Sequence, residues 1–198
     1  MIVKKKIRHV FLKTNILQFF YSHIWKTRFV SVPIEQLRCQ QKPFSEILGF
    51  AGKTIQHFPP CKFFQMFLIN PEIAYKTFFD WLHECLINKQ AHRVPISDGG
   101  WQNSALVRTI SELHRKNKID MPSIDDADMH LLKKAIHNYV QHNFRIFKSI
   151  KNEGYNRRLY PPIYCSLKGS YYYIENGHRR VSALWALGYS HVIVALKK

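Results

Sequence analysis

The sequence predicts an α/β (α+β) fold, with short strands near both ends of the chain and helices between them. A β-branched segment, RFVSVP, occupies 28–33, and the end of the chain alternates short strand-like runs with tight turns. The middle of the chain carries apolar residues at helical spacing instead. With 198 residues, of which 46% are apolar and 14% aromatic, the chain is globular and long enough for one good core.

The chain is strongly basic. It has 30 Lys and Arg against 13 Asp and Glu, which gives a net charge of +17 at pH 7. Such an excess favours a polyanionic partner, which can be nucleic acid, an anionic membrane surface or a phosphorylated substrate. The four cysteines show no C-x-x-C pair and no zinc-type spacing, so we expect a cytoplasmic protein in which they are small buried apolar residues.

Residues 1–27 form a basic segment that is rich in apolar and aromatic side chains. Residues 1–34 contain seven Lys or Arg and no acid, and no run approaches the ~18 to 20 apolar residues needed to span a bilayer. One interpretation is an amphipathic helix on anionic lipid, which places the protein peripherally on the inner membrane face. The other is a helix whose apolar side packs on the rest of the chain.

The first half of the remaining chain predicts short elements and one clear helix. A strand at 28–33 precedes a helical turn at 34–37, another short helix is expected at 44–50, and Pro59–Pro60 breaks the chain. Asn70 is a suitable N-cap and Pro71 a suitable first residue for the next helix. The expected buried stripe of this helix is Ile73, Phe78, Trp81, Leu82, Cys85 and Leu86.

The second half predicts a loop, two helices and a compact final unit. A Pro/Gly loop at 92–103 leads into a helix at 101–114, and a long helix from Asp125 to Glu153 ends at Gly154. The expected buried face of the long helix is Leu131, Leu132, Ile136, Tyr139, Val140, Phe147 and Ile150. The elements expected after it are strands at 162–167 and 170–175, a turn at Asn176–Gly177, a helix at 178–187 and a strand at 191–196.

The turn at Asn176–Gly177 is the most informative feature for function. A helix that begins directly after a strand gathers unpaired backbone N–H groups and the positive end of the helix dipole at one point, which suits an anion. Arg179 and Arg180 add guanidinium groups that match phosphate oxygens, and His178 adds a titratable donor. The alternative is a helix that caps itself and pairs its arginines with nearby acids.

The residues around this turn resemble the ParB N-terminal domain superfamily, which includes sulfiredoxin and the free serine kinases. The matching segments are Ser149–Ile150 with Gly154, Pro161–Ile163, Ile174–Arg180, Leu187–Gly188 and Val192–Val194, with a similar opening strand and turn at 28–37. The resemblance implies a single domain over 28–198, with a small mixed sheet of ParB/sulfiredoxin type and a large, mostly helical insertion at about 39–125. It also implies that Asn176, Gly177, His178, Arg179 and Arg180 bind the phosphates of a nucleotide.

The residue after Gly177 separates the branches of this superfamily. ParB proteins have Glu there and sulfiredoxins have a catalytic Cys. This chain has His178, which resembles the His that the free serine kinases have at this position. The turn also stands close to the last residue of the sequence, which leaves no room for the helix-turn-helix module that reads DNA. We therefore expect neither sulfiredoxin chemistry nor typical ParB partition function.

A kinase needs a carboxylate that accepts the hydroxyl proton or holds Mg²⁺. Where the kinase branch has acids, this chain has Asn176 and, after the first strand, Gln40–Gln41. The remaining candidates are Glu175, Glu35, Glu46 and Asp98. Asp98 is favoured because it lies in a polar Asp-Gly-Gly loop beside His92 and Arg93. The alternative for this loop is an ordinary turn between helices.

The leading hypothesis is a nucleotide-dependent phosphotransferase, a kinase that uses ATP or ADP with Mg²⁺ on a hydroxyl-bearing or phosphorylated small molecule or glycan. Its expected catalytic residues are His178, Asp98, Glu175 and Glu35, and its expected substrate-binding residues are His92, Arg93, Arg157 and Arg158. One alternative is a ParB-like DNA-associated nucleotide-binding or nuclease protein without its own helix-turn-helix, supported by the charge and the many aromatic residues. Another is a non-catalytic regulator that only binds its ligand.

Overall fold

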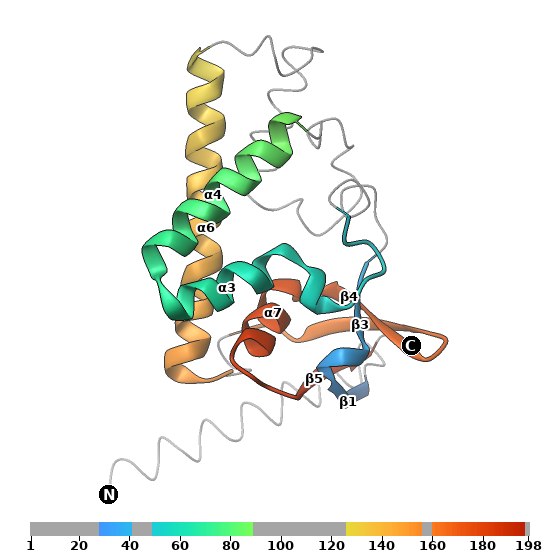
Figure 1. The fold of residues 1–198 in the computed structure, drawn as a ribbon. Coiled ribbons are helices and arrows are strands. Elements are labelled where there is room, and N and C mark those ends of the chain that lie inside the picture. Colours follow the sequence, from blue (N-terminus) through green and yellow to red (C-terminus); the bar gives the residue numbers. More distant parts are fainter. Residues whose placement is uncertain (1–27, 41–48, 89–125, 156–159, 197–198) are drawn as a thin grey trace, which may run out of the picture.

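The computed structural model describes residues 28–40, 49–88, 126–155 and 160–196, which form a five-stranded mixed sheet packed against four α-helices (Figure 1). The predicted α/β class is therefore confirmed. The strands are β1 Arg28–Pro33, β2 Leu37–Cys39, β3 Ile163–Lys168, β4 Tyr171–Asn176 and β5 His191–Leu196. The helices are α3 Pro59–Ile69, α4 Pro71–Asn88, α6 Asp126–Glu153 and α7 His178–Ala186, with 3-10 turns η1 Ile34–Gln36 and η2 Ile55–His57.

The sheet is assembled around the strands from the end of the chain. Its order is β1-β5-β3-β4-β2, so the two N-terminal strands form the two edges. β1 pairs with β5 and β3 with β4 in antiparallel fashion, whereas β3–β5 and β2–β4 are parallel pairs. The sheet is therefore mixed, and β1 and β5, from opposite ends of the described residues, are hydrogen-bonded to each other.

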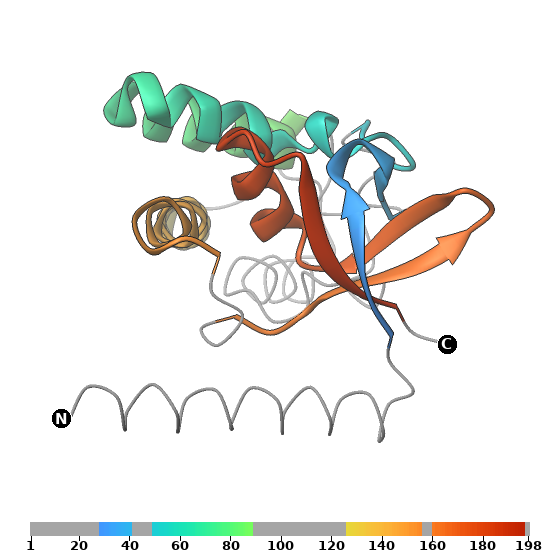
Figure 2. The same ribbon diagram turned by 90° about the horizontal axis from the view of Figure 1, so that it is seen from below.

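The short connection between the edge strands requires a strongly curved sheet. Only η1 separates β1 from β2, and three residues cannot reach across a flat sheet of this width, whose edges would lie about 19 Å apart. The Ile34 amide donates to the Ser190 carbonyl oxygen at 2.9 Å, which fixes the start of this turn next to β5. The sheet consequently encloses a concave side, and this side faces the helices (Figure 2).

The helices cover the concave side in three levels. Helix α7 lies nearest the sheet, α3 and α6 pack on α7, and α4 packs on α3 and α6 (Figures 1 and 2). A single cluster of buried apolar residues runs from the sheet through all four helices. Phe64 and Phe67 of α3 stack on Phe147 and Phe144 of α6, with ring centroids 4.8 Å apart in both pairs. Helices α3 and α4 thus belong to the same core as the sheet.

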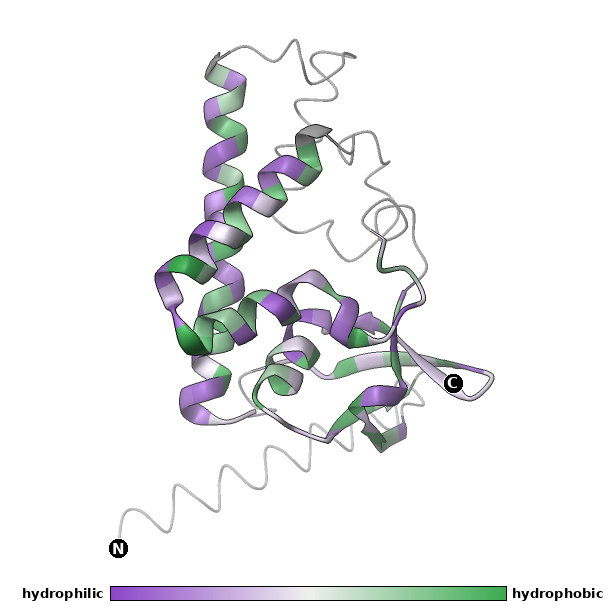
Figure 3. Cartoon of the chain, viewed as in Figure 1, coloured by the Kyte–Doolittle hydropathy of each residue, from purple (hydrophilic) through white to green (hydrophobic). Residues whose placement is uncertain are grey.

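Helix α3 is an element that the sequence interpretation misses. The expectation that Pro59–Pro60 breaks the chain is wrong, because these residues are the first two of α3. Proline fits there because the first N–H groups of a helix have no intrahelical acceptor and its φ is already helical. Two members of the expected buried stripes, Ile73 and Leu131, are 55% and 47% exposed. Apart from these two residues, α4 and α6 each have a polar and an apolar face, which Figure 3 shows.

Several other expectations are confirmed. α4 begins at Pro71, and the Asn70 side-chain oxygen accepts hydrogen bonds from the amides of Glu72 and Ile73, both at 3.1 Å. All four cysteines are free and buried. The expected elements at 1–27, 92–103 and 101–114, and most of that at 44–50, lie outside the described residues. No helix in the described part of the chain is long and apolar enough to cross a membrane.

Candidate functional site

The turn between β4 and α7 forms as the sequence predicts. β4 ends at Asn176, Gly177 adopts a left-handed conformation with φ of +108°, and α7 begins at His178. A Cβ atom at Gly177 would lie 2.9 Å from Cγ1 of Ile163, so both the dihedral angle and the close approach favour glycine. The amides of Arg180 and Val181 donate to the Gly177 carbonyl oxygen, whereas those of His178 and Arg179 precede the helical ladder.

Arg180 points into the protein. Its side chain is only 6% exposed, and its guanidinium group donates to the carbonyl oxygen of Pro161 and, at 3.5 Å, to the side-chain oxygen of Asn176. Burial lowers the pKa of Arg180, and the Tyr155 hydroxyl opposes this effect. The partners of Arg180 are thus oxygens of the protein itself, which ties the start of β3 to α7. The guanidinium group of Arg180, which we expect from the sequence to bind phosphate, is instead hydrogen-bonded within the protein.

Arg179 faces a different environment, on the side of α6. Its guanidinium carbon lies 4.6 Å from the centre of the Tyr139 ring, and its side chain is half-buried. Burial raises the pKa of Tyr139, and the charge of Arg179 opposes this rise. Desolvation lowers the pKa of His142, and the cations Arg179 and Arg145 lower it further. The start of α7 is therefore a region of positive potential, since the helix dipole and these arginines act in the same sense.

His178 is half-buried at the first position of α7. Its ring lies 5.3 Å from that of Phe58, and its carbonyl oxygen accepts a hydrogen bond from the Ser182 hydroxyl at 2.8 Å. The imidazole therefore stands at the point where the turn meets the residues that lead into α3. This position combines a titratable group with the exposed end of the helix.

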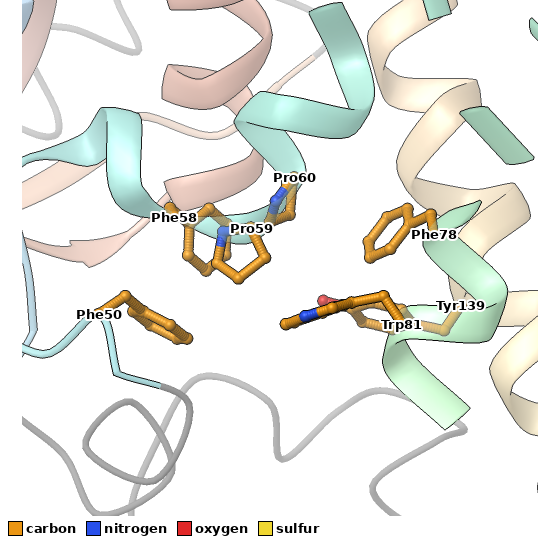
Figure 4. A pocket seen from close by; sticks show the side chains of 7 residues that line it. All are labelled: Phe50, Phe58, Pro59, Pro60, Phe78, Trp81 and Tyr139. Atoms are coloured by element: carbon orange, nitrogen blue, oxygen red, sulfur yellow. The ribbon is translucent and has the colours of Figure 1, made fainter. Parts of the chain in front are cut away.

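An apolar hollow lies directly beside this turn. It is shallow, with interior room for about one water molecule, and its lining residues are Phe50, Phe58, Pro59, Pro60, Phe78, Trp81 and Tyr139. Figure 4 shows Phe50 on one side and Trp81 and Tyr139 on the other, with Phe58 and the two prolines between them. Phe58 lies against His178 and Tyr139 lies against Arg179, so two residues that line the hollow also contact residues of the turn. None of these lining residues was predicted as part of a site.

The carboxylates expected at the site are differently placed. Glu175 follows buried Ile174 on β4, and the alternation of a strand puts its side chain on the sheet face opposite to the core. Glu35 is exposed on η1, and its carbonyl oxygen accepts a hydrogen bond from Arg38 at 2.6 Å. Asp98, His92, Arg93, Arg157 and Arg158 lie outside the described residues. Within the described ranges, no group of three or more His, Cys, Asp or Glu could hold a metal ion.

The thiols near the turn are held in their protonated form. Burial raises the pKa of Cys165, on β3, to about 12, and the charge of Glu175 raises it further. Burial likewise raises the pKa of Cys61 to about 12, although a hydrogen bond with Ser182 opposes this rise. The Cys61 thiol donates to the Ile55 carbonyl oxygen at 3.0 Å. A thiol with such a pKa is a poor nucleophile at neutral pH.

No protein-family model, no curated protein and no solved structure matches this chain. The geometry of the turn and of the hollow beside it therefore supports the functional proposal without help from a relative.

Proposed function

We propose that this chain is a nucleotide-dependent phosphotransferase that binds ATP or ADP across the β4–α7 turn. The observation that carries the proposal is the continuity of the turn with the aromatic hollow through Phe58 and Tyr139. A nucleotide needs a cationic site for its phosphates directly beside an apolar site for its base. The two halves of this region have those two characters.

The phosphates would lie at the start of α7. The amide of Arg179 precedes the helical ladder there, and its guanidinium group adds a charge that lies over the Tyr139 ring. Amides at a helix start, together with a guanidinium group, are a strong combination for phosphate oxygens. Arg180 would act indirectly, because its bonds to Pro161 and Asn176 hold the turn in place.

The base would lie against the open side of the hollow. Aromatic rings on two sides suit a flat, polarisable group, and a mostly apolar lining is typical of pockets for such ligands. The transfer step would move the terminal phosphoryl group to a hydroxyl of a small molecule or glycan. That hydroxyl loses its proton to a base as the bond to the leaving phosphate breaks. His178 is the titratable side chain at this end of the site, and Asp98 remains a candidate from outside the described residues.

Nucleotide titrations of matched arginine variants test the proposal. ATP and ADP should raise the melting temperature of the chain, because a ligand of the folded state stabilises it. Arg179→Ala should weaken nucleotide binding by about tenfold or more, since it removes a charge-assisted contact. Arg28→Ala is the matched control: it removes the same charge from the exposed start of β1 and should leave the affinity nearly unchanged.

A second pair of ligands separates the two halves of the site. Trp81→Leu should weaken ATP but leave tripolyphosphate unaffected, because tripolyphosphate has no base to place in the hollow. Release of ADP in the presence of hydroxyl-bearing acceptors would then report transfer. Nucleotide binding without transfer to any acceptor would favour the ligand-binding regulator, and the absence of any thermal shift with nucleotides would contradict the site altogether.

A further inference from the structure

The convex face of the sheet carries a second set of chemically distinctive residues. The described helices lie on the concave side, where Ile163, Cys165 and Ile174 are buried (Figure 2). Strand alternation therefore places Tyr171 and Tyr173 on the opposite, convex face, and the same holds for Lys168 and Arg38. We call these four residues the tyrosine patch. Tyr171 is 44% exposed, so its ring is accessible.

The patch is organised by two cation–π pairs across three neighbouring strands. The guanidinium carbon of Arg38 lies 4.2 Å from the centre of the Tyr171 ring, and Nζ of Lys168 lies 5.5 Å from that of Tyr173. In the strand register Lys168 is opposite Tyr171 and Arg38 is beside Tyr173, so each cation reaches diagonally to the other tyrosine, two residues along β4. Rings and charges thus alternate over a small area of the convex face.

We infer that the tyrosine patch binds single-stranded RNA. Aromatic rings on an open sheet face can stack with unpaired bases, while neighbouring cations contact the backbone phosphates. A duplex would hide its bases from such a surface. Hydroxyl groups also lie on this face, from the tyrosines and from Ser166, which pairs with Tyr173. They can bond the 2′-hydroxyl that distinguishes RNA from DNA, and the net charge of +17 favours the polyanion.

This surface is separate from the proposed nucleotide site. The turn at Gly177–Arg179 and its aromatic hollow belong to the concave, helix-covered side. Loss of RNA binding would therefore leave the nucleotide proposal standing, and the converse also holds. Addition of ATP should not change the affinity for RNA by more than about twofold, which is within the usual error of a single-site measurement.

The test is fluorescence anisotropy with the full chain and a labelled RNA about ten nucleotides long, a typical length for one such site. The double variant Tyr171→Ala, Tyr173→Ala should bind at least about tenfold more weakly, since two stacking rings are lost. The variant with Phe at both positions retains the rings and should stay within a few-fold of the parent. Tyr189→Ala is the control, because Tyr189 is 45% exposed but lies in the turn before β5.

A matched pair of lysines tests the electrostatic part. Lys168→Ala should reduce the slope of log affinity against log salt by about 0.7, the effect of one phosphate contact on a single strand. Lys148→Ala removes the same charge from another lysine that lies near an aromatic ring, Phe67, at 5.3 Å. It should leave the slope unchanged, because Lys148 is on α6.

Four outcomes would overturn the inference. The first is unchanged RNA binding by a folded Tyr171→Ala, Tyr173→Ala protein. The second and third concern the parent protein: an affinity for duplex DNA equal to that for RNA, and equal or tighter binding of the single-stranded DNA of the same sequence. The fourth is a double variant that no longer binds anionic phosphatidylserine vesicles but still binds RNA. The last outcome would identify the face as a lipid-contacting surface. Circular dichroism and the melting temperature without ligand verify that each variant is folded.

Discussion

At the scale of single residues, Gly177 determines how the strand passes into the helix. Its φ of +108° and the 2.9 Å approach of a hypothetical Cβ to Ile163 are two separate costs for any other residue. Gly188, with φ of +82° and no atom within 4 Å of such a Cβ, carries only the first of these costs. The two glycines therefore provide a comparison within one helix, since they stand at its opposite ends.

We predict that Gly177→Ala destabilises the protein more than Gly188→Ala. The left-handed backbone should cost about 1 kcal/mol in each case. The contact with Ile163 should add to this only at Gly177, because Ile163 is fully buried and has little room to move. Urea unfolding of both variants measures the difference. Equal losses would mean that Ile163 gives way, and that the close approach does not constrain the turn.

The buried thiols predict a decline of stability at alkaline pH. Burial raises the pKa of Cys39, Cys61 and Cys165 from the ordinary value of 9.0 to about 12 in the folded protein. The folded state thus holds these protons more tightly than the unfolded state. Their contribution is fully present below pH 9 and is lost as pH rises from 9 towards 12. Urea unfolding at a series of pH values should show this loss.

Two measurements control the thiol prediction. Cys165→Ala should make the alkaline decline shallower, because one of the three shifted groups is removed. A disulfide-exchange reagent should react slowly with the native protein at neutral pH and with all four cysteines after denaturation, since they are free and buried. Rapid labelling of native Cys165 would contradict both its burial and its raised pKa.

The residue scale also shows where inference from the sequence ends. The turn at Gly177 and the start of α7 could be predicted, because the local sequence determines both. The inward direction of Arg180 was not, because its main acceptor is the Pro161 carbonyl oxygen, 19 residues earlier in the chain. The hollow beside the turn could not be predicted either, because it also depends on contacts between residues far apart in the sequence. Its walls come from α3, α4, α6 and the residues before η2, and no local pattern brings these together.

At the scale of elements, α4 shows how a local signal predicts a boundary. The Asn70 side chain accepts two amide hydrogen bonds, and Pro71 occupies the first helical position. The preference of proline for the first helical positions also applies to α3, although two prolines in succession suggest a break in the chain. The structure places Pro60 in the buried core and so gives α3 a tertiary reason to start there. Propensity alone could not reveal this contact.

We predict that Asn70→Ala lowers the free energy of unfolding by about 1 kcal/mol, since it leaves two amides of α4 without their cap. Asn70→Asp keeps the acceptor and adds a charge that the helix dipole favours, so it should be neutral or slightly stabilising. Urea titrations followed by circular dichroism measure both. An Asn70→Ala protein as stable as the parent would show that solvent replaces the cap.

At the scale of the whole molecule, one core connects the sheet with all four helices. Phe147 is central to it: the residue is fully buried and stacks on Phe64 of α3 at 4.8 Å. A continuous core predicts cooperative unfolding, in which distant elements lose structure together. Most of the main elements could be predicted from hydrophobic spacing and turn residues, whereas α3 and β2 could not. The strand order could not, because it depends on pairing between opposite ends of the chain.

We predict that Phe147→Ala destabilises the protein by about 3–5 kcal/mol, through lost burial and the cavity that remains. Amide hydrogen exchange should accelerate by a similar factor in α6 and in β5, because both belong to one cooperative unit. Leu131→Ala on the same helix is the control and should cost little, since Leu131 is 47% exposed. Faster exchange confined to α6 would indicate that the helices and the sheet unfold independently.

The position of the two edge strands has a consequence for how the protein is made. β1 and β2 are synthesised before the four described helices, whereas their partners β5 and β4 follow α6 in the sequence. The apolar residues of β1 therefore remain without their partner strand until β5 has been synthesised. Chains dominated by such distant pairings fold slowly and are exposed to aggregation while they wait. Release of His191–Leu196 is the event that lets the nascent chain complete its sheet, so a holdase chaperone would be most useful to this protein before that moment.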